Sequence, residues 1–259
     1  MDTLTIGTRE FRSRLILGTG KYRSFEEMRA CLEASGAEII TVALRRLDLS
    51  NPHQPSLLDY IDPNRYVILP NTAGCKTVQE AIQTARLAAA MGLPHWVKLE
   101  VIPNAKYLLP DPIATLEATK VLVEEGFDVL PYINADPVLA QQLQDAGSVT
   151  VMPLGSAIGS GQGLLNLSQI QIIIEQARVP VVVDAGIGAP SDAALAMELG
   201  AAACLVNTAV AQAKESVRMA HAMRLGVEAG RAAYLAGRIP RQPYATASSP
   251  TVGLPSVGR

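Results

Sequence analysis

Cysteine is scarce in this sequence of 259 residues. The three cysteines, Cys31, Cys75 and Cys204, form neither an even set nor a CxxC pair. This argues against a disulfide framework, and we expect neither a metal nor a cofactor. The sequence predicts reduced cysteines that pack in the core. Cys75 follows a predicted strand end, where functional loops occur, which makes it a candidate nucleophile, but the lack of a nearby His or Cys partner makes that role the less favoured one.

An excess of either charge is also missing. The 22 basic and 24 acidic residues give a formal net charge of -2, which argues against nucleic acid as the main ligand. No apolar stretch is long enough to cross a membrane, and the first ten residues lack the basic and apolar regions of a signal peptide. We expect a soluble cytoplasmic protein without a membrane partner, in which any anion is bound at a local site.

A regular alternation of apolar strand-like runs and helical patterns is present instead. The strand-like runs lie at residues 15–20, 39–44, 66–69, 95–101, 128–133, 149–152, 179–183 and 203–206. The helical patterns lie at 24–36, 57–61, 78–91, 112–126, 137–146, 168–176, 190–199 and about 213–235. This alternation predicts an α/β fold, a single (β/α)8 TIM-type barrel over residues 1–237, and favours it over a doubly wound sheet. Residues 238–259 contain four prolines and predict an irregular C-terminal tail.

The strand-like run 95–101 carries two opposite charges in an otherwise apolar segment. Alternation places Trp96, Lys98 and Glu100 on one side of this strand. A lysine is rarely buried without a partner or a task, and active sites of such barrels lie at the C-terminal strand ends. Lys98 is therefore the first catalytic candidate, with Glu100 and Asp184 as nearby carboxylates. Burial disfavours the ammonium form and frees the amine to form an imine with a ketone or aldehyde. A purely structural ion pair between Lys98 and Glu100 is the alternative.

Three consecutive loops at the predicted strand ends are rich in glycine and small residues. They span residues 155–163, 185–188 and 207–208. Glycine lets the backbone approach an anion closely, and the start of the following helix adds its positive dipole end. Loops seven and eight of such barrels commonly hold phosphate. Each loop alone is explained equally well as an ordinary turn, but the three together predict a phosphate site.

Eight motifs are spread over the chain: Leu17-Gly-Thr-Gly-Lys-Tyr22, Thr41-Val-Ala-Leu-Arg-Arg46, Leu69-Pro-Asn-Thr-Ala-Gly-Cys75, Val97-Lys-Leu-Glu-Val101, Pro153-Leu-Gly155, Ile158-Gly-Ser-Gly161, Val183-Asp-Ala-Gly-Ile-Gly188 and Leu205-Val-Asn-Thr-Ala209. Together these motifs resemble those of the thiazole synthases of thiamin biosynthesis, the ThiG family. Ser156-Ala157 stands where many members of the family have Ala-Pro, which is a small change in a turn.

The resemblance implies a specific reaction. Lys98 would form a Schiff base with the ketone of 1-deoxy-D-xylulose 5-phosphate, sulfur would come from the C-terminal thiocarboxylate of the carrier protein ThiS, and dehydroglycine (2-iminoacetate) would close the thiazole ring. Glu100 and Asp184 match the acid/base carboxylates of the family. The resemblance also implies a homo-oligomer, a homotetramer, and it places the substrate phosphate against Gly159, Ala185, Gly186, Asn207 and Thr208.

Two other functions use the same residues. A Schiff-base aldolase that acts on a sugar phosphate needs the same lysine, carboxylates and phosphate site, but it turns over without a carrier protein. A non-catalytic barrel that binds a phosphorylated metabolite leaves Lys98 merely ion-paired. For a carrier with a negatively charged tail, two features offer a cationic entrance, Arg45-Arg46 after the second strand and the loop 104–110 with Lys106 and Tyr107 after the fourth. The alternative is that Arg45 and Arg46 only pair with carboxylates such as Asp48.

Overall fold

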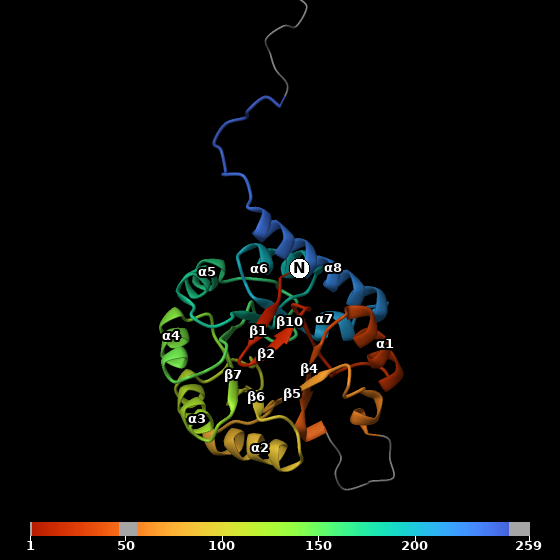
Figure 1. Ribbon diagram of the computed structural model, residues 1–259, viewed down its shortest axis with the longest axis vertical. Helices are drawn as coiled ribbons and strands as arrows, with labels where there is room; N and C mark the ends of the chain where they lie inside the picture. The colour runs from red at the N-terminus through yellow and green to blue at the C-terminus, as the bar shows by residue number, and fades with distance from the viewer. Residues whose placement is uncertain (1, 47–55, 249–259) are drawn as a thin grey trace, which may run out of the picture.

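The computed structural model describes residues 2–46 and 56–248, and its centre is an eight-stranded parallel barrel (Figure 1). The sheet order is β8-β7-β6-β5-β4-β3-β10-β9, and bridges from Val151 to Val181 and from Leu154 to Asp184 join its two edges. The strands are β3 (Leu15–Gly18), β4 (Ile39–Ala43), β5 (Val67–Asn71), β6 (Trp96–Leu99), β7 (Asp128–Ile133), β8 (Met152–Pro153), β9 (Val182–Asp184) and β10 (Ala203–Val206). The predicted (β/α)8 barrel is confirmed.

Helices form a ring around the barrel (Figure 1). They are α1 (Phe25–Ser35), α2 (Val78–Ala90), α3 (Pro112–Glu124), α4 (Pro137–Asp145), α5 (Leu167–Gln176), α6 (Pro190–Glu198) and α8 (Ser216–Ala236), each close to its predicted range. Between β4 and β5, the predicted short helix is a 3-10 helix, η2 (Leu57–Tyr60), and not an α-helix. Pro55 and Pro63 leave too short a segment for several α-helical turns. The one-turn helix α7 (Thr208–Ala211) was not predicted.

Side-chain caps explain why several helices begin where they do. The Ser24 hydroxyl accepts a hydrogen bond from the Glu27 backbone N–H, as the capping pattern predicts. The reciprocal bond of a capping box is absent at this helix start, because the Glu27 carboxylate instead accepts from the Arg23 backbone N–H. Asp111 and Asp136 cap α3 and α4 in the same way, each followed by a proline at the first helical position.

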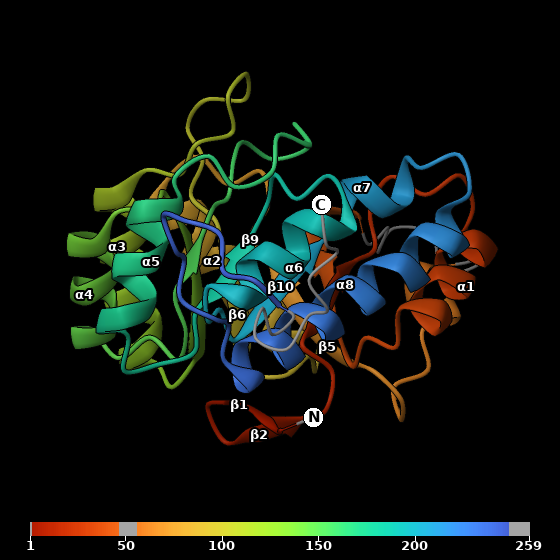
Figure 2. The ribbon, with the colours of Figure 1, turned by 90° about the horizontal axis from the view of Figure 1, so that it is seen from above.

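The N-terminal segment closes one end of the barrel, which the sequence did not predict. Strands β1 (Leu4–Ile6) and β2 (Arg9–Phe11) form an antiparallel hairpin across that end (Figure 2). The Phe11 ring stacks on the Trp96 ring inside the barrel, with the centroids 6.2 Å apart. The buried Arg14 guanidinium donates hydrogen bonds to the carbonyls of Ala202 and Thr3 and so ties the hairpin to the barrel. Access to the barrel interior is therefore left to the opposite end.

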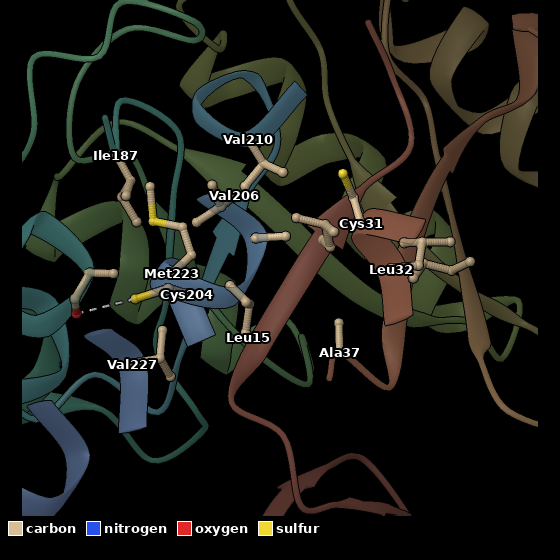
Figure 3. Packing of buried hydrophobic residues seen from close by; sticks show 14 of the residues in the cluster. Leu15, Cys31, Leu32, Ala37, Ile187, Cys204, Val206, Val210, Met223 and Val227 are labelled. Atoms are coloured by element: carbon tan, nitrogen blue, oxygen red, sulfur yellow. Dashed lines mark hydrogen bonds between the residues drawn. The ribbon is translucent and has the colours of Figure 1, made fainter. Parts of the chain in front are cut away.

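Besides the apolar residues inside the barrel, an apolar core lies between the strands and the outer helices. In Figure 3, Leu15 and Cys204 on the strands pack against Cys31 of α1 and Met223 of α8. All three cysteines are buried and free, as predicted. Among the described residues, no helix has both the length and the apolarity that a membrane crossing needs. After α8, residues 238–248 contain no helix or strand and are exposed to solvent.

Candidate active site

Strand β6 holds Lys98 inside the open end of the barrel. Alternation along β6 points Trp96 and Lys98 inward, Trp96 into the apolar floor and Lys98 above it. Glu100 follows β6 directly, and Asp184 is the last residue of β9. The Lys98 Nζ lies 3.0 Å from Glu100 Oε1 and 2.7 Å from Asp184 Oδ2, and all three side chains are at most 6% exposed. The two predicted carboxylates therefore meet the predicted lysine.

The protonation state of Lys98 differs from the one predicted. Burial lowers the pKa of Lys98, but the charges of Asp184 and Glu100 and their short contacts outweigh burial and raise it above its ordinary value. The expectation of a free amine in the resting protein is wrong, because two carboxylates, and not apolar walls alone, surround the ammonium group. Burial, opposed by the charge of Lys98, raises the pKa of Asp184.

The surroundings of this centre hold it in place. Thr72 bridges to Glu100 through two hydrogen bonds of 2.8 Å, one donated to the Glu100 carbonyl and one accepted from its N–H. The Tyr132 ring lies 5.4 Å from Lys98 Nζ, and sequence reasoning missed this residue because its strand reads as ordinary core. Asp184 Oδ2 meets Nζ as a charge contact and has no aligned hydrogen bond within the described residues. An oxygen so placed can accept a proton from Nζ.

A cavity of about 670 Å³ opens above Lys98 at the C-terminal ends of the strands. It is lined by every residue that the sequence analysis assigned to catalysis or phosphate binding: Lys98, Glu100, Gly159, Asp184, Ala185, Gly186, Asn207 and Thr208. The loops after β8, β9 and β10 thus face the same space as the lysine. That volume is in the range of small-molecule sites.

The loop after β3 adds a cation to the predicted phosphate side. Lys21 Nζ lies 3.5 Å from the Thr208 hydroxyl, and a Cβ at Gly159 would lie 3.4 Å from the same Nζ. Sequence reasoning did not assign Lys21 to the phosphate site. The signal that could have indicated it is the Gly-Thr-Gly-Lys motif directly after a strand. With its amide assigned so that the nitrogen faces these acceptors, the Asn207 side chain donates to the carbonyls of Gly18 (3.2 Å) and Gly20 (2.9 Å) and holds this loop.

Gly186 keeps the loops after β8 and β9 in direct contact. Its φ is +78°, and a Cβ there would lie 2.0 Å from Ser156 Oγ and 2.5 Å from the Ser156 nitrogen. Ala185 also has a positive φ of 74°, which an alanine adopts only where the surrounding structure imposes it. Sequence reasoning expected small residues here, and the reason is this close approach.

Cys75 is the remaining candidate from the sequence. Its side chain is buried, and its Sγ lies 3.3 Å from the Thr84 hydroxyl. Burial raises the pKa of the Cys75 thiol, which disfavours the reactive thiolate and argues against a nucleophile. Within residues 2–46 and 56–248, no group of three or more His, Cys, Asp and Glu side chains is arranged to hold a metal ion.

Together, the fold and the site define a (β/α)8-barrel enzyme whose cavity holds a buried lysine between two carboxylates. The family described as "Thiazole biosynthesis protein ThiG" matches residues 5–250 of the sequence. The chain therefore belongs to the ThiG family, the thiazole synthases of thiamin biosynthesis.

Similar proteins agree with this assignment. The chain is 58% identical over 258 residues to a thiazole synthase of Acaryochloris marina. The alignment covers 97% of the chain and 94% of the relative. It is also 58% identical over 251 residues to a thiazole synthase of Anoxybacillus flavithermus. That alignment covers 97% of the chain and 98% of the relative. A crystal structure of the Amycolatopsis orientalis BexX/CysO complex matches with a TM-score of 0.82 and 36% identity, over 93% of this chain and 98% of that one. The resemblance seen in the motifs is confirmed.

Proposed function

We propose that this enzyme builds its thiazole on a Schiff base between Lys98 and the ketone of 1-deoxy-D-xylulose 5-phosphate. Sulfur then comes from the thiocarboxylate of a ThiS carrier, and dehydroglycine completes the ring. The observation that carries the proposal is the position of Lys98 Nζ, 2.7 Å and 3.0 Å from two buried carboxylates and open to the cavity. A buried amine with proton acceptors in contact is the arrangement that imine chemistry needs.

The first step needs a neutral amine, which the resting ammonium group must become. Asp184 is the better acceptor of this proton, because its contact with Nζ is the shorter one and because its pKa is raised. The amine nitrogen then attacks the ketone carbon and forms a carbinolamine. Asp184 returns the proton to the carbinolamine oxygen, the C–O bond breaks, and water leaves as the imine forms.

Glu100 has the second role in the proposal. The protonated imine draws electrons from the neighbouring carbon of the sugar and makes its C–H bond acidic. Glu100 Oε1, which lies 3.0 Å from Nζ, is close enough to that carbon to remove its proton and to return it elsewhere along the chain. The carbonyl character thereby moves along the sugar, which prepares the carbon that receives sulfur.

The phosphate of the sugar would lie on the far side of the cavity from Lys98. Ala185, Gly186, Asn207 and Thr208 line that side, on the loops after β9 and β10, which lie across the barrel from β6, and Gly159 on the loop after β8 lies beside Thr208. The Lys21 ammonium beside Thr208 adds a positive charge there. Backbone approach at glycine and a nearby cation suit a dianion.

A partner protein is also part of the proposal. BexX, the structural neighbour, was crystallised as a complex with CysO, which supports a carrier partner for this chain as well. The cavity that holds the candidate site is lined by residues at the C-terminal ends of the strands, so a carrier tail would enter there. The protein would act in the cytoplasm, and the homotetramer implied by its family stays a prediction.

Borohydride trapping tests the Schiff base. Wild-type protein mixed with 1-deoxy-D-xylulose 5-phosphate and then reduced should gain the mass of one covalent adduct on Lys98. Lys98→Arg keeps a cation between the two carboxylates but cannot form an imine, so it should fold normally and gain no adduct. An adduct on the arginine variant would disprove the assignment of Lys98.

The same assay separates the alternatives. A Schiff-base aldolase would also give the adduct, but without borohydride it would cleave the sugar phosphate in the absence of any carrier, whereas a thiazole synthase should give a sulfur-containing product only when a thiocarboxylated carrier is added. A non-catalytic binding barrel would give no adduct at all.

A further inference from the structure

The cavity contains more positive charge than Lys98 and the phosphate side account for. Four basic side chains line it, Lys21, Arg45, Lys76 and Lys98, against the two acidic side chains of Glu100 and Asp184. Both acids contact Lys98. Lys21 lies beside Thr208 on the phosphate side. Arg45 and Lys76 therefore form a separate positive region of the same cavity.

This second positive region lies next to the strand of Lys98. Arg45 follows β4 and Lys76 follows β5, and the sheet order places β5 directly beside β6. Asn71, at the end of β5, is the register partner of Lys98, is 8% exposed and lines the cavity. The loops after β9 and β10 lie on the far side of the barrel from β6. The cavity thus has positive groups on two sides, with Lys98 beside one of them.

Gly74 sets the position of Arg45. A Cβ at residue 74 would lie 1.8 Å from Arg45 Nη1 and 2.3 Å from its Cζ, so the guanidinium occupies the space that a side chain at residue 74 would fill. The φ of Gly74 is +95°, a conformation that also favours glycine. Among the ion pairs between described residues, none involves Arg45 or Lys76.

We propose that Arg45, Lys76 and the Asn71 amide form a second anion subsite, which binds the carboxylate of the small glycine-derived α-imino acid. This inference rests on the proposed function, since it assigns a place to the second small substrate of that reaction. The planar guanidinium pairs with a carboxylate through two parallel hydrogen bonds, and the amide and ammonium groups add further donors.

The location favours a small ligand over a carrier tail. In a two-carbon acid the carboxylate is one bond from the reacting carbon, so its anchor must lie close to the sugar carbons that Lys98 holds. Asn71, paired in register with Lys98 and nearly buried, meets that requirement, and the exposed side chains of Arg45 and Lys76 line the same cavity. The tail of a carrier protein, in contrast, needs contacts along its length up to the solvent.

Oxamate is a suitable probe because it is a planar two-carbon carboxylate that cannot form an imine with Lys98. Its dissociation constant is measured by calorimetry on the full chain, wild type and variants. Arg45→Gln and Lys76→Gln should each weaken oxamate binding about tenfold or more, the loss that follows removal of a charge-assisted hydrogen bond. Arg45→Lys should fall between wild type and Arg45→Gln. Lys106→Gln is the matched control, because Lys106 is an exposed cation on the loop after β6 that does not line the cavity.

Two further readouts distinguish a subsite for the small acid from a docking site for the carrier tail. Arg45→Gln should lose more oxamate affinity than sugar-phosphate trapping by borohydride. Equal oxamate affinity in wild type and Arg45→Gln overturns the subsite. A variant that loses affinity for the carrier protein but keeps its oxamate affinity overturns it in favour of a docking site for the tail. Failure of trapping in the wild type refutes the Schiff base alone, since oxamate binding is measured without the sugar phosphate.

Discussion

Two opposing electrostatic effects act on the Lys98 amine. Burial favours the neutral form, whereas the contacts with Glu100 and Asp184 favour the ammonium form and outweigh it. The ammonium form therefore holds two buried carboxylates together. A resting ion pair does not exclude catalysis, because the raised pKa of Asp184 makes that carboxylate ready to take the proton when substrate arrives.

Lys98→Met tests this balance through stability. The change leaves Glu100 and Asp184 buried with like charges, which at pH 8 should cost about 3 kcal/mol of unfolding free energy. Without the lysine, the pKa of Asp184 rises further above its unfolded value. Stability is then retained at low pH, where the carboxyl is protonated in both states, and is lost as pH rises through the folded pKa. Denaturant unfolding of wild type and variant from about pH 3, below the ordinary pKa of an aspartate, up to pH 8 measures the difference.

A double variant provides the control for this prediction. Adding Glu100→Gln to Lys98→Met removes one of the two like charges and should recover part of the loss at pH 8. A loss that is independent of pH would show that packing, and not charge, causes the effect.

Among the elements, the β1–β2 hairpin has the clearest structural task. It covers the end of the barrel opposite the candidate site, with Phe11 stacked on Trp96 and Arg14 bound to backbone carbonyls (Figure 2). Asp2 supports this arrangement through ion pairs with Arg14 and Arg231. The hairpin therefore contributes to stability without contacting the cavity.

Phe11→Ala should destabilise the protein by about 3 kcal/mol, because it removes a buried ring and leaves a space against Trp96. Phe11→Leu fills most of that space and should cost about 1 kcal/mol. Chemical denaturation monitored by Trp96 fluorescence measures both costs. Borohydride trapping by the folded variants should match wild type, and a selective loss of trapping would contradict the purely structural role of the hairpin.

At the scale of the whole molecule, the barrel contains nearly all of the buried surface. Helix α8 ends at Ala236, and the described part of the segment that follows is exposed, including Ile239 (81%) and Tyr244 (84%). Such a segment adds little apolar burial to the fold. We therefore expect residues 1–237 to fold on their own as one domain.

Truncation after Gly237 tests this expectation. The shortened chain should keep the melting temperature of the full chain within a few degrees, because only exposed contacts are lost among the described residues. Sedimentation of both chains gives the oligomeric state and tests the homotetramer at the same time. A large fall in melting temperature would show that the tail is part of the folded unit, and a matching fall in subunit number would place it in an interface.

The sequence by itself determined most of the secondary structure and the identity of the central residues. The period of apolar residues and the capping pattern at Ser24 are local signals, so most helix starts were predictable to within a residue or two, and that of α8 to within three. Lys98, Glu100 and Asp184 stood out because charges inside apolar strands are rare. The eightfold alternation implied the closed sheet.

Tertiary structure alone decided which groups meet across the barrel. The contact between Lys98 on β6 and Asp184 on β9 connects two strands that are distant in sequence. It helps to raise the pKa of Lys98, which is the opposite of the expected effect of burial. The contact of Lys21 with Thr208 and that of Arg45 with Gly74 also join distant segments. The hairpin of residues 4–11 needed the barrel floor before its short strands could bury an apolar face. Sequence patterns report the periodicity of single elements, whereas charges and contacts between elements depend on the three-dimensional positions that the closed barrel imposes.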